Sequence, residues 1–265
     1  MSDNRPVGLF DSGVGGISVM KELRKILPHE DLIYFADSAN CPYGNNPPEF
    51  IRERARIISD FLLSQGIKLL VIACNTASVA ALSQIRQALV IPVVGIEPAI
   101  KPATTLTRNG RVGVLATGVT LAGERFTSLV ERFADGIEVY SQACPGLVEM
   151  IEAGQIESED TKELLSAYLE KLLAQEVDTI VLGCTHYPFL RPEVENLAGE
   201  KVKVIDTGSA VSQQVARVLA ANQLLTSTED SGQEIFYTNG TSPEIERVIR
   251  QLWGDPNLIV HQINI

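Results

Sequence analysis

Two cysteines in this sequence each stand at the end of a short apolar run and before a polar turn. Cys74 closes the run in ACNTAS (73–78), and Cys184 closes the run in GCTHYP (183–188). An apolar run followed by residues that cap helices is typical of a buried strand leading into a helix. The field at a helix N-terminus favours the reactive thiolate form of a cysteine. A single such cysteine is adequately explained as a small buried hydrophobic residue, but two in matched settings indicate chemistry.

Four kinds of chemistry use such a pair. A metal site made of Cys74, Cys184 and His186 lacks a second local pair of ligands, and a redox dithiol normally uses a C-x-x-C motif, which this sequence does not contain. Cys184 with His186 as its base would make a hydrolase or transferase, but Cys74 would then have no role. Two thiols on opposite faces of one carbon, one removing a proton and the other returning one, would invert a stereocentre. This last arrangement uses both cysteines and needs neither further metal ligands nor a C-x-x-C motif.

Two loops near the N-terminus contain further candidates. FDSGVGGIS (10–18) has glycines that let the main chain approach a ligand, but Ser18 stands where a dinucleotide-binding fingerprint needs glycine. Asp11 would repel a phosphate there, and it suits an ammonium group or a proton relay beside a thiol. DSANCPYG (37–44) indicates a fixed turn that offers main-chain N–H groups. The remaining cysteines and histidines are interpreted as background: Cys41, Cys144, His29 and His261.

Short apolar runs alternate with helical patterns along the chain, which favours parallel sheets covered by helices on both faces. Such folds bind ligands beyond the carboxyl ends of their strands. The strands are expected at Val7–Phe10, Leu32–Phe35, Leu69–Ala73, Val93–Ile96, Val112–Leu115, Glu138–Tyr140, Thr179–Leu182 and Val202–Ile205. The clearest helices are expected at Ile17–Leu27, Glu49–Gln65 and Thr161–Gln175.

The two cysteine motifs belong to a longer internal echo. GLFDSGVGG (8–16) precedes ACNTAS much as GVLATGVTLAG (113–123) precedes GCTHYP. The echo predicts an α/β fold of two similar parallel-sheet domains related by pseudo-symmetry, with the active site in the cleft between them. The first domain is expected over 1–97 and 208–265, and the second over 98–207. The helix-breaking Pro98 and Pro102 and the turn at Asp206–Ser209 would mark the crossovers, and 236–238 and 258–263 would add strands to the first domain.

The composition of this chain of 265 residues is that of an ordinary globular protein, with 45% hydrophobic and 21% charged residues. Its net charge of −11 argues against a nucleic-acid partner or an anionic membrane surface, because phosphates are recognised by basic surfaces. The N-terminus lacks a signal-peptide pattern, and the longest apolar run, Leu69 to Ala73, is far too short to span a membrane. A cytoplasmic protein with free thiols is therefore expected.

Taken in order, the motifs GLFDSGVGG, DSANCPYG, ACNTAS, CPGLVEMIE and GCTHYP resemble those of the glutamate racemases, in the aspartate/glutamate racemase superfamily. The resemblance implies a cofactor-independent isomerase that interconverts L- and D-glutamate and supplies D-glutamate to peptidoglycan biosynthesis, and so to cell-wall biogenesis and cell shape. It implies Cys74 and Cys184 as the two acid/base thiols. It also implies that Asp11 assists Cys74, and that Glu152 and His186 assist Cys184.

The resemblance extends to substrate binding and partners. It implies that glutamate contacts Asp11, Ser12, Tyr43, Gly44, Asn75, Thr76, Thr117, Thr120, Thr185 and His186. It implies neither a metal nor a cofactor, and it suggests a homodimer. Asn40 stands where the family motif usually has arginine, and Cys41 is unusual beside it. Three alternatives stay open: a racemase of the same superfamily acting on aspartate or another substrate, a Cys184–His186 hydrolase or transferase, and a binding protein without turnover.

Overall fold

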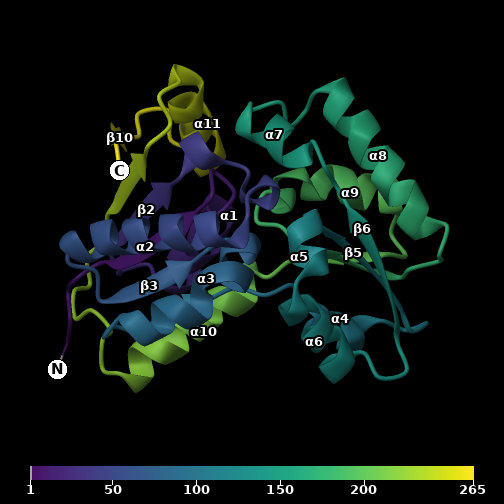
Figure 1. Ribbon diagram of the computed structural model, residues 1–265, viewed down its shortest axis with the longest axis horizontal. Helices are drawn as coiled ribbons and strands as arrows, with labels where there is room; N and C mark the ends of the chain where they lie inside the picture. Colours follow the sequence, from purple (N-terminus) through teal and green to yellow (C-terminus); the bar gives the residue numbers. More distant parts are fainter. Residues whose placement is uncertain (1) are drawn as a thin grey trace. The chain divides into compact units, whose positions relative to one another are not determined.

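The structure is a computed structural model and describes residues 2–265 (Figure 1). The chain divides into two compact units, called here the first domain (Met1–Ile96 with Gly208–Ile265) and the second domain (Glu97–Thr207). Each contains one sheet in which all paired strands are parallel, with helices on both faces. The predicted fold class of two parallel-sheet α/β domains is confirmed.

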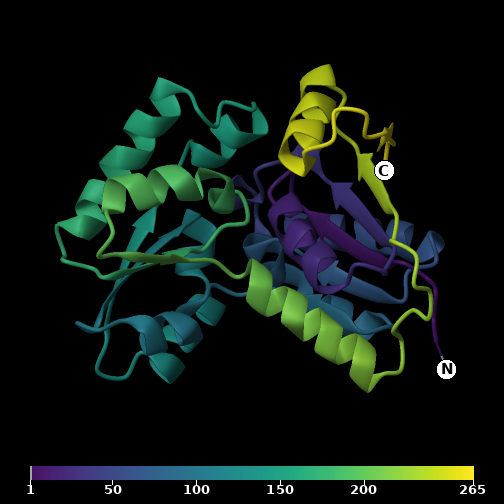
Figure 2. The ribbon, with the colours of Figure 1, turned by 180° about the vertical axis from the view of Figure 1, so that it is seen from behind.

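The first domain is built on a six-stranded sheet in the order β10-β9-β2-β1-β3-β4. Helices α2 and α3 cover one face, and α1, α10 and α11 cover the other (Figure 2). The strands are β1 (Val7–Asp11), β2 (Leu32–Ala36), β3 (Leu69–Ile72), β4 (Val93–Gly95), β9 (Glu234–Thr238) and β10 (Val260–Gln262). The helices are α1 (Ile17–Ile26), α2 (Pro48–Ser64), α3 (Asn75–Ala88), α10 (Gly208–Ala221) and α11 (Pro243–Trp253), with short 3-10 helices η1 (Ser38–Asn40) and η2 (Tyr43–Asn45). Because both faces are covered, β1, β2 and β3 are buried along their whole length.

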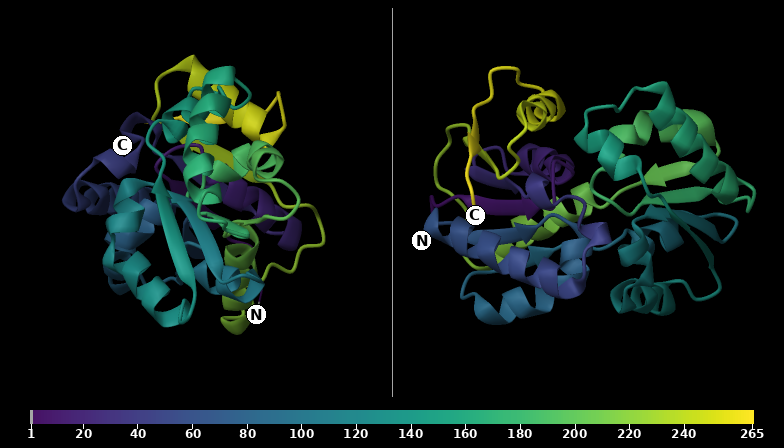
Figure 3. Two further views of the ribbon diagram at one scale, coloured as in Figure 1. Left: turned by 90° about the vertical axis from the view of Figure 1, so that its right-hand side faces the viewer. Right: turned by 45° about the horizontal axis from the view of Figure 1, so that its top comes forward.

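The second domain repeats this architecture on a smaller scale. Its four-stranded sheet has the order β6-β5-β7-β8. Helices α7, α8 and α9 lie on one face and α4, α5 and α6 on the other (Figure 3). The strands are β5 (Arg111–Ala116), β6 (Glu138–Ala143), β7 (Thr179–Leu182) and β8 (Lys203–Ile205). The helices are α4 (Ile100–Leu106), α5 (Gly118–Ala122), α6 (Glu124–Phe133), α7 (Leu147–Glu152), α8 (Glu159–Leu173) and α9 (Arg191–Ala198), with the 3-10 helix η3 (Tyr187–Leu190).

The eight expected strands and three expected helices are confirmed, with ends that differ by a few residues at most. The C-terminal strands also join the first sheet as expected, since β9 pairs with β2 and β10 with β9. The expectation that Pro102 breaks a helix is wrong, because Pro102 is the third residue of α4. Proline is tolerated in a first turn, where its missing N–H would have no partner within the helix.

The same strand order recurs in both domains, because β2-β1-β3-β4 corresponds to β6-β5-β7-β8. Matching main-chain bonds follow the paired strands: Ala73 N donates to Phe10 O at 2.8 Å, and Gly183 N donates to Leu115 O at 2.7 Å. The residue after each donor is Cys74 in one domain and Cys184 in the other. Each cysteine therefore follows the strand at which the winding order reverses, which is where parallel sheets bind ligands.

Among residues 2–265, none of the helices combines the length and the apolar character needed to cross a membrane.

Candidate functional site

In the first domain, a serine hydroxyl connects the predicted acid Asp11 with the thiol of Cys74. Asp11 is the last residue of β1, and Cys74 follows β3 on the neighbouring strand. Ser12 Oγ donates to Asp11 Oδ1 at 2.9 Å, and the Cys74 thiol donates to Ser12 Oγ at 3.8 Å. All three side chains are buried. The Asp11 carboxylate is thus linked to the thiol through one hydroxyl, which is a route for a proton.

The glycine-rich turn after β1 is required by this geometry. A Cβ on Gly16 would lie 2.9 Å from the Cβ of Asp11 and 2.9 Å from Tyr34 Oη, closer than real Cβ contacts allow. Tyr34 Oη in turn donates to Gly13 O at 2.6 Å and closes the loop. The glycines predicted to let the main chain approach a ligand therefore also let α1 begin directly against Asp11.

Cys74 is the N-cap residue of α3, since its sulfur accepts a hydrogen bond from Ala77 N at 3.4 Å. The predicted position at a strand end and a helix start is confirmed, since α3 begins at Asn75, directly after the cysteine. The polar residues expected to cap this helix are its first turn instead. Ser78, for example, bonds Ile72 O and Ile96 N. The thiol therefore lies at the positive end of α3.

Asn75 is the strongest indication of a ligand in this domain. Its side chain is only 3% exposed, and neither Oδ1 nor Nδ2 makes a hydrogen bond to the described protein, residues 2–265. Burying an unpaired amide costs about 1–3 kcal/mol, so an amide in that position indicates a partner that is not part of the chain. An amide can accept from an ammonium group and donate to a carboxylate, the two groups of an amino acid. Thr76, the next predicted contact, is buried beside it in the same helical turn.

Tyr43 and Gly44 form the start of η2, but the Tyr43 side chain is directed into the protein and its hydroxyl is already bound there. The ring is fully buried and its hydroxyl donates to Asp37, a residue that the sequence did not single out. Burial, reinforced by the Asp37 charge, raises the pKa of Tyr43 well above its usual range, so the hydroxyl stays protonated. Any substrate contact here falls to the main-chain N–H groups. A polar residue two positions after the predicted strand Leu32–Phe35 was the signal for Asp37.

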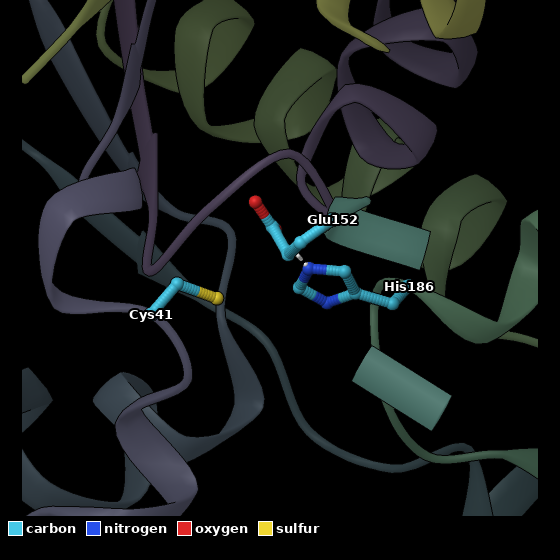
Figure 4. Close-up of side chains that lie close together, drawn as sticks. All are labelled: Cys41, Glu152 and His186. Atoms are coloured by element: carbon cyan, nitrogen blue, oxygen red, sulfur yellow. Dashed lines mark hydrogen bonds and ion pairs between the residues drawn. The ribbon is translucent and has the colours of Figure 1, made fainter. Parts of the chain in front are cut away.

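In the second domain, Cys184, His186 and Glu152 form a chain of contacts. His186 Nδ1 lies 3.7 Å from Cys184 Sγ. Figure 4 shows the ring of His186 against Glu152, with Nε2 at 2.6 Å from Glu152 Oε1. His186 is 1% exposed, and Glu152 ends α7. A carboxylate only accepts, so Nε2 carries the hydrogen and the Nδ1 lone pair faces the thiol. His186 is therefore placed to take the proton of Cys184, with Glu152 holding the ring and stabilising its protonated form.

Carboxylate and imidazole groups are also metal ligands. Within Glu97–Thr207, no third His, Cys, Asp or Glu side chain joins Glu152 and His186 closely enough to complete a three-ligand site.

The setting of Cys184 differs from the prediction in one respect. The matched motifs predict that both cysteines precede an α-helix, but Cys184 is followed by the 3-10 helix η3 and only then by α9. Pro188 and Pro192 explain the delay, because proline lacks the N–H of a continuous helical ladder and fits only at helix starts. Cys184 thus has a histidine beside it, whereas Cys74 has an α-helix N-terminus.

The other predicted contacts of this domain lie at the same sheet edge. Thr117 follows β5 and caps α5, accepting from Thr120 N at 3.3 Å and donating to Thr120 Oγ1 at 3.0 Å. Thr120 and Thr185 are buried, and Thr117 is half-buried. A Cβ on Gly183 would lie 3.0 Å from Leu115 O, so a glycine there lets the Cys184 strand end pack closely against β5. The structure gathers these residues, and their contacts with a substrate stay predictions.

The second domain contains another thiol, Cys144, which follows β6. Burial, the main cause, raises the pKa of Cys144 to about 12. Its sulfur donates to Gln142 O at 3.4 Å and has no base comparable to His186 in the described contacts of this domain. Of the two thiols at this sheet edge, Cys184 is therefore the one equipped for proton transfer.

We expect Cys144 to resist alkylation in the folded protein. At pH 8 a thiol with a pKa near 12 is ionised about a thousandfold less than a free cysteine, and only the thiolate reacts. Peptide mapping by mass spectrometry after iodoacetamide treatment measures this, with the same protein in urea as the control. Labelling of folded Cys144 at the rate of free cysteine would contradict the assignment.

Comparisons with known proteins agree on one family. A sequence model of the family described as Asp/Glu/Hydantoin racemase matches residues 13–215. The glutamate racemase of Pseudomonas aeruginosa strain PAO1 is 50% identical over 258 residues, which cover 97% of each chain. Many further curated proteins match as well.

Solved structures give the same result. The Escherichia coli glutamate racemase, solved with L-glutamate and the activator UDP-MurNAc-ala, matches with a TM-score of 0.86 at 34% identity, covering 98% of this chain and 100% of that one. The Francisella tularensis glutamate racemase, solved with D-glutamate, matches with a TM-score of 0.85 at 32% identity, covering 99% and 98%. Chains similar to this one over nearly their full length therefore bind each enantiomer of the same amino acid.

Proposed function

Because this chain belongs to the Asp/Glu/Hydantoin racemase family, we propose that it interconverts L- and D-glutamate by moving protons between the α-carbon and two thiols, Cys74 and Cys184. The observation that supports this most is the pair of matched cysteines, each following the strand at which its sheet reverses its winding order. Each has its own acid/base partners, as two proton-transferring thiols require. Glutamate is favoured over aspartate because the relatives that match over nearly the whole chain are glutamate racemases.

The chemistry assigned to each domain follows from its contacts. One thiolate removes the α-proton, and the opposite thiol donates a proton to the other face of the same carbon. Cys74 passes its proton toward Asp11 through Ser12, and Cys184 passes its proton to His186, which Glu152 supports. The pair must hold one thiolate and one thiol at a time for a proton to be removed from one face and returned to the other.

Substrate binding has to overcome an unfavourable global charge. The chain has a net charge of −11 and glutamate is a net anion, so attraction must come from local groups. We assign the N–H groups at the start of α3 and the Nδ2 of the buried Asn75 amide to the α-carboxylate, and the Oδ1 of Asn75 to the ammonium group. The main-chain N–H groups of Tyr43 and Gly44, with Thr117, Thr120 and Thr185, are assigned to the carboxylates. Donors fixed in place before the reaction also stabilise the charge that develops when the α-proton leaves.

The decisive experiment is a racemisation assay in D₂O. We expect L-glutamate to be converted to equal amounts of both enantiomers with deuterium at the α-carbon, since the proton returned comes from a thiol that exchanges with solvent. Polarimetry measures inversion and NMR measures exchange. Added pyridoxal phosphate should change neither rate, because both transfers are assigned to side chains. Faster turnover of aspartate, or inversion with retention of the α-hydrogen, would overturn the proposal.

Three further points belong to the proposal. The D-glutamate produced would supply peptidoglycan biosynthesis, the enzyme would work in the cytoplasm, and two copies would form a homodimer. Analytical ultracentrifugation of the purified chain tests the last point, with a monomer at micromolar concentration as the contrary result.

A further inference from the structure

The first domain contains a buried carboxylate that the proton-transfer chemistry does not use. Asp37 follows β2 and is fully buried. Its Oδ1 accepts from Asn40 Nδ2 at 3.0 Å, from Arg54 Nη2 at 2.7 Å and from Asn239 Nδ2. Its Oδ2 accepts from Arg54 Nε at 3.0 Å and from the Tyr43 hydroxyl. These donors come from η1, η2, α2 and the residue after β9.

This saturation decides what Asp37 can do. A carboxylate offers about four lone-pair sites, and the donors around Asp37 occupy them all. The forked Arg54 pair also balances the charge of the fully buried Asp37 carboxylate. Asp37 therefore has no free position for a proton or a substrate group. Its main-chain N–H, however, donates to Asp11 O at 3.1 Å, so its position is tied directly to the site.

Asn239 holds the same loop at two points. Besides donating to Asp37, its side chain accepts through Oδ1 from Ala39 N at 3.0 Å. Asn239 is 8% exposed and comes directly after β9, the strand hydrogen-bonded to β2. The Asn239 amide thus holds both the Asp37 carboxylate and the main chain at Ala39, directly beyond the paired ends of β2 and β9.

From these contacts we propose that Asp37, Arg54 and Asn239 form a clamp that positions the loop 38–46 for substrate. The proposal rests on the proposed function, in which the main-chain N–H groups of Tyr43 and Gly44 meet glutamate. The Tyr43 hydroxyl is bound to Asp37, so clamp and binding groups are parts of one rigid unit. The clamp residues touch no reacting atom, and they act on substrate affinity rather than on proton transfer.

The test is the KM of glutamate in the Asn239→Ala variant. The variant loses both hydrogen bonds of the Asn239 side chain, which loosens a loop that binds substrate and transition state alike. KM should therefore rise about tenfold, while kcat stays within about threefold of wild type. The matched control is Arg24→Ala. Arg24 pairs with Glu234 at the opposite end of β9 and bonds the carbonyl of Glu30. The Arg24→Ala variant should lower the melting temperature about as much as Asn239→Ala does, and it should leave KM unchanged.

A second variant covers the case in which Asn239→Ala does not fold. Arg54→Lys keeps the positive charge beside Asp37 but loses the fork, and it should also raise KM with little change in kcat. A folded Asn239→Ala or Arg54→Lys protein with wild-type KM, or one that loses kcat instead, would overturn the clamp alone. Failure of the wild type to racemise glutamate in the same assay would overturn the proposed function, and the clamp's role with it.

Discussion

Replacing Cys74 by alanine is expected to lower kcat for glutamate racemisation by at least about a thousandfold, and Cys184→Ala is expected to do the same. Each direction of the reaction needs one thiolate to remove a proton and one thiol to return it, so removing either leaves one face of the α-carbon without a proton donor or acceptor. A thousandfold loss corresponds to about 4 kcal/mol in the activation barrier. Polarimetry with L- and D-glutamate measures both directions.

Cys74→Ala and Cys184→Ala should differ in which enantiomer of glutamate still exchanges its α-hydrogen with D₂O. With one thiol left, a proton can still be removed from the face it meets, exchange with D₂O and return to that face without inversion. We therefore expect slow α-hydrogen exchange of one enantiomer in Cys74→Ala and of the other enantiomer in Cys184→Ala, measured by NMR. This mirror-image result is specific to two thiols on opposite faces.

The matched control for both variants is Cys144→Ala, which removes a buried thiol outside the proposed pair. It should keep racemisation within about threefold of wild type, because a thiol with a pKa of about 12 is almost never in the thiolate form that removes a proton at neutral pH. Near-wild-type racemisation by Cys74→Ala would contradict the two-thiol mechanism and favour chemistry confined to Cys184 and His186.

The parts of the site that the sequence predicted are those encoded locally. Cys74 and Cys184 each follow a buried apolar run within a few residues, so strand periodicity alone places them at the edge of a parallel sheet. The same applies to the glycine-rich turn after β1. The α-helix expected directly after Cys184 is wrong because the prolines at the starts of η3 and α9 interrupt the helical hydrogen bonds there, whatever the likeness of the two motifs.

The clamp around Asp37 was not predicted, for two different reasons. Arg54 lies three residues after Ile51 and four before Ile58, on the apolar face of the predicted helix, and a charge there indicates a buried partner. That signal was present in the sequence. Asn239 had none, because its partners Asp37 and Ala39 lie in a distant part of the chain and only the pairing of β9 with β2 brings them together.

His186→Asn is expected to lower kcat about a hundredfold, and Glu152→Gln about tenfold. Asparagine removes the base that faces Cys184, and general-base catalysis contributes about 10²–10⁴-fold. Glutamine can still accept a hydrogen bond from Nε2 but no longer stabilises the protonated ring, so its effect should be smaller. Steady-state kinetics of both variants measure the two losses, and His29→Asn, at an exposed histidine, is the control.

The alkylation rates of the two thiols show whether His186 acts through Cys184. His186→Asn should slow the reaction of Cys184 with iodoacetamide at pH 7 about tenfold, because no neighbouring base then takes its proton. Cys74 should react at an unchanged rate, because its proton route runs through Ser12 and Asp11. It serves as an internal control within the same molecule. Equal slowing of both thiols would mean that the histidine supports the fold generally, and an unchanged Cys184 would mean that the base acts on the substrate rather than on the thiol.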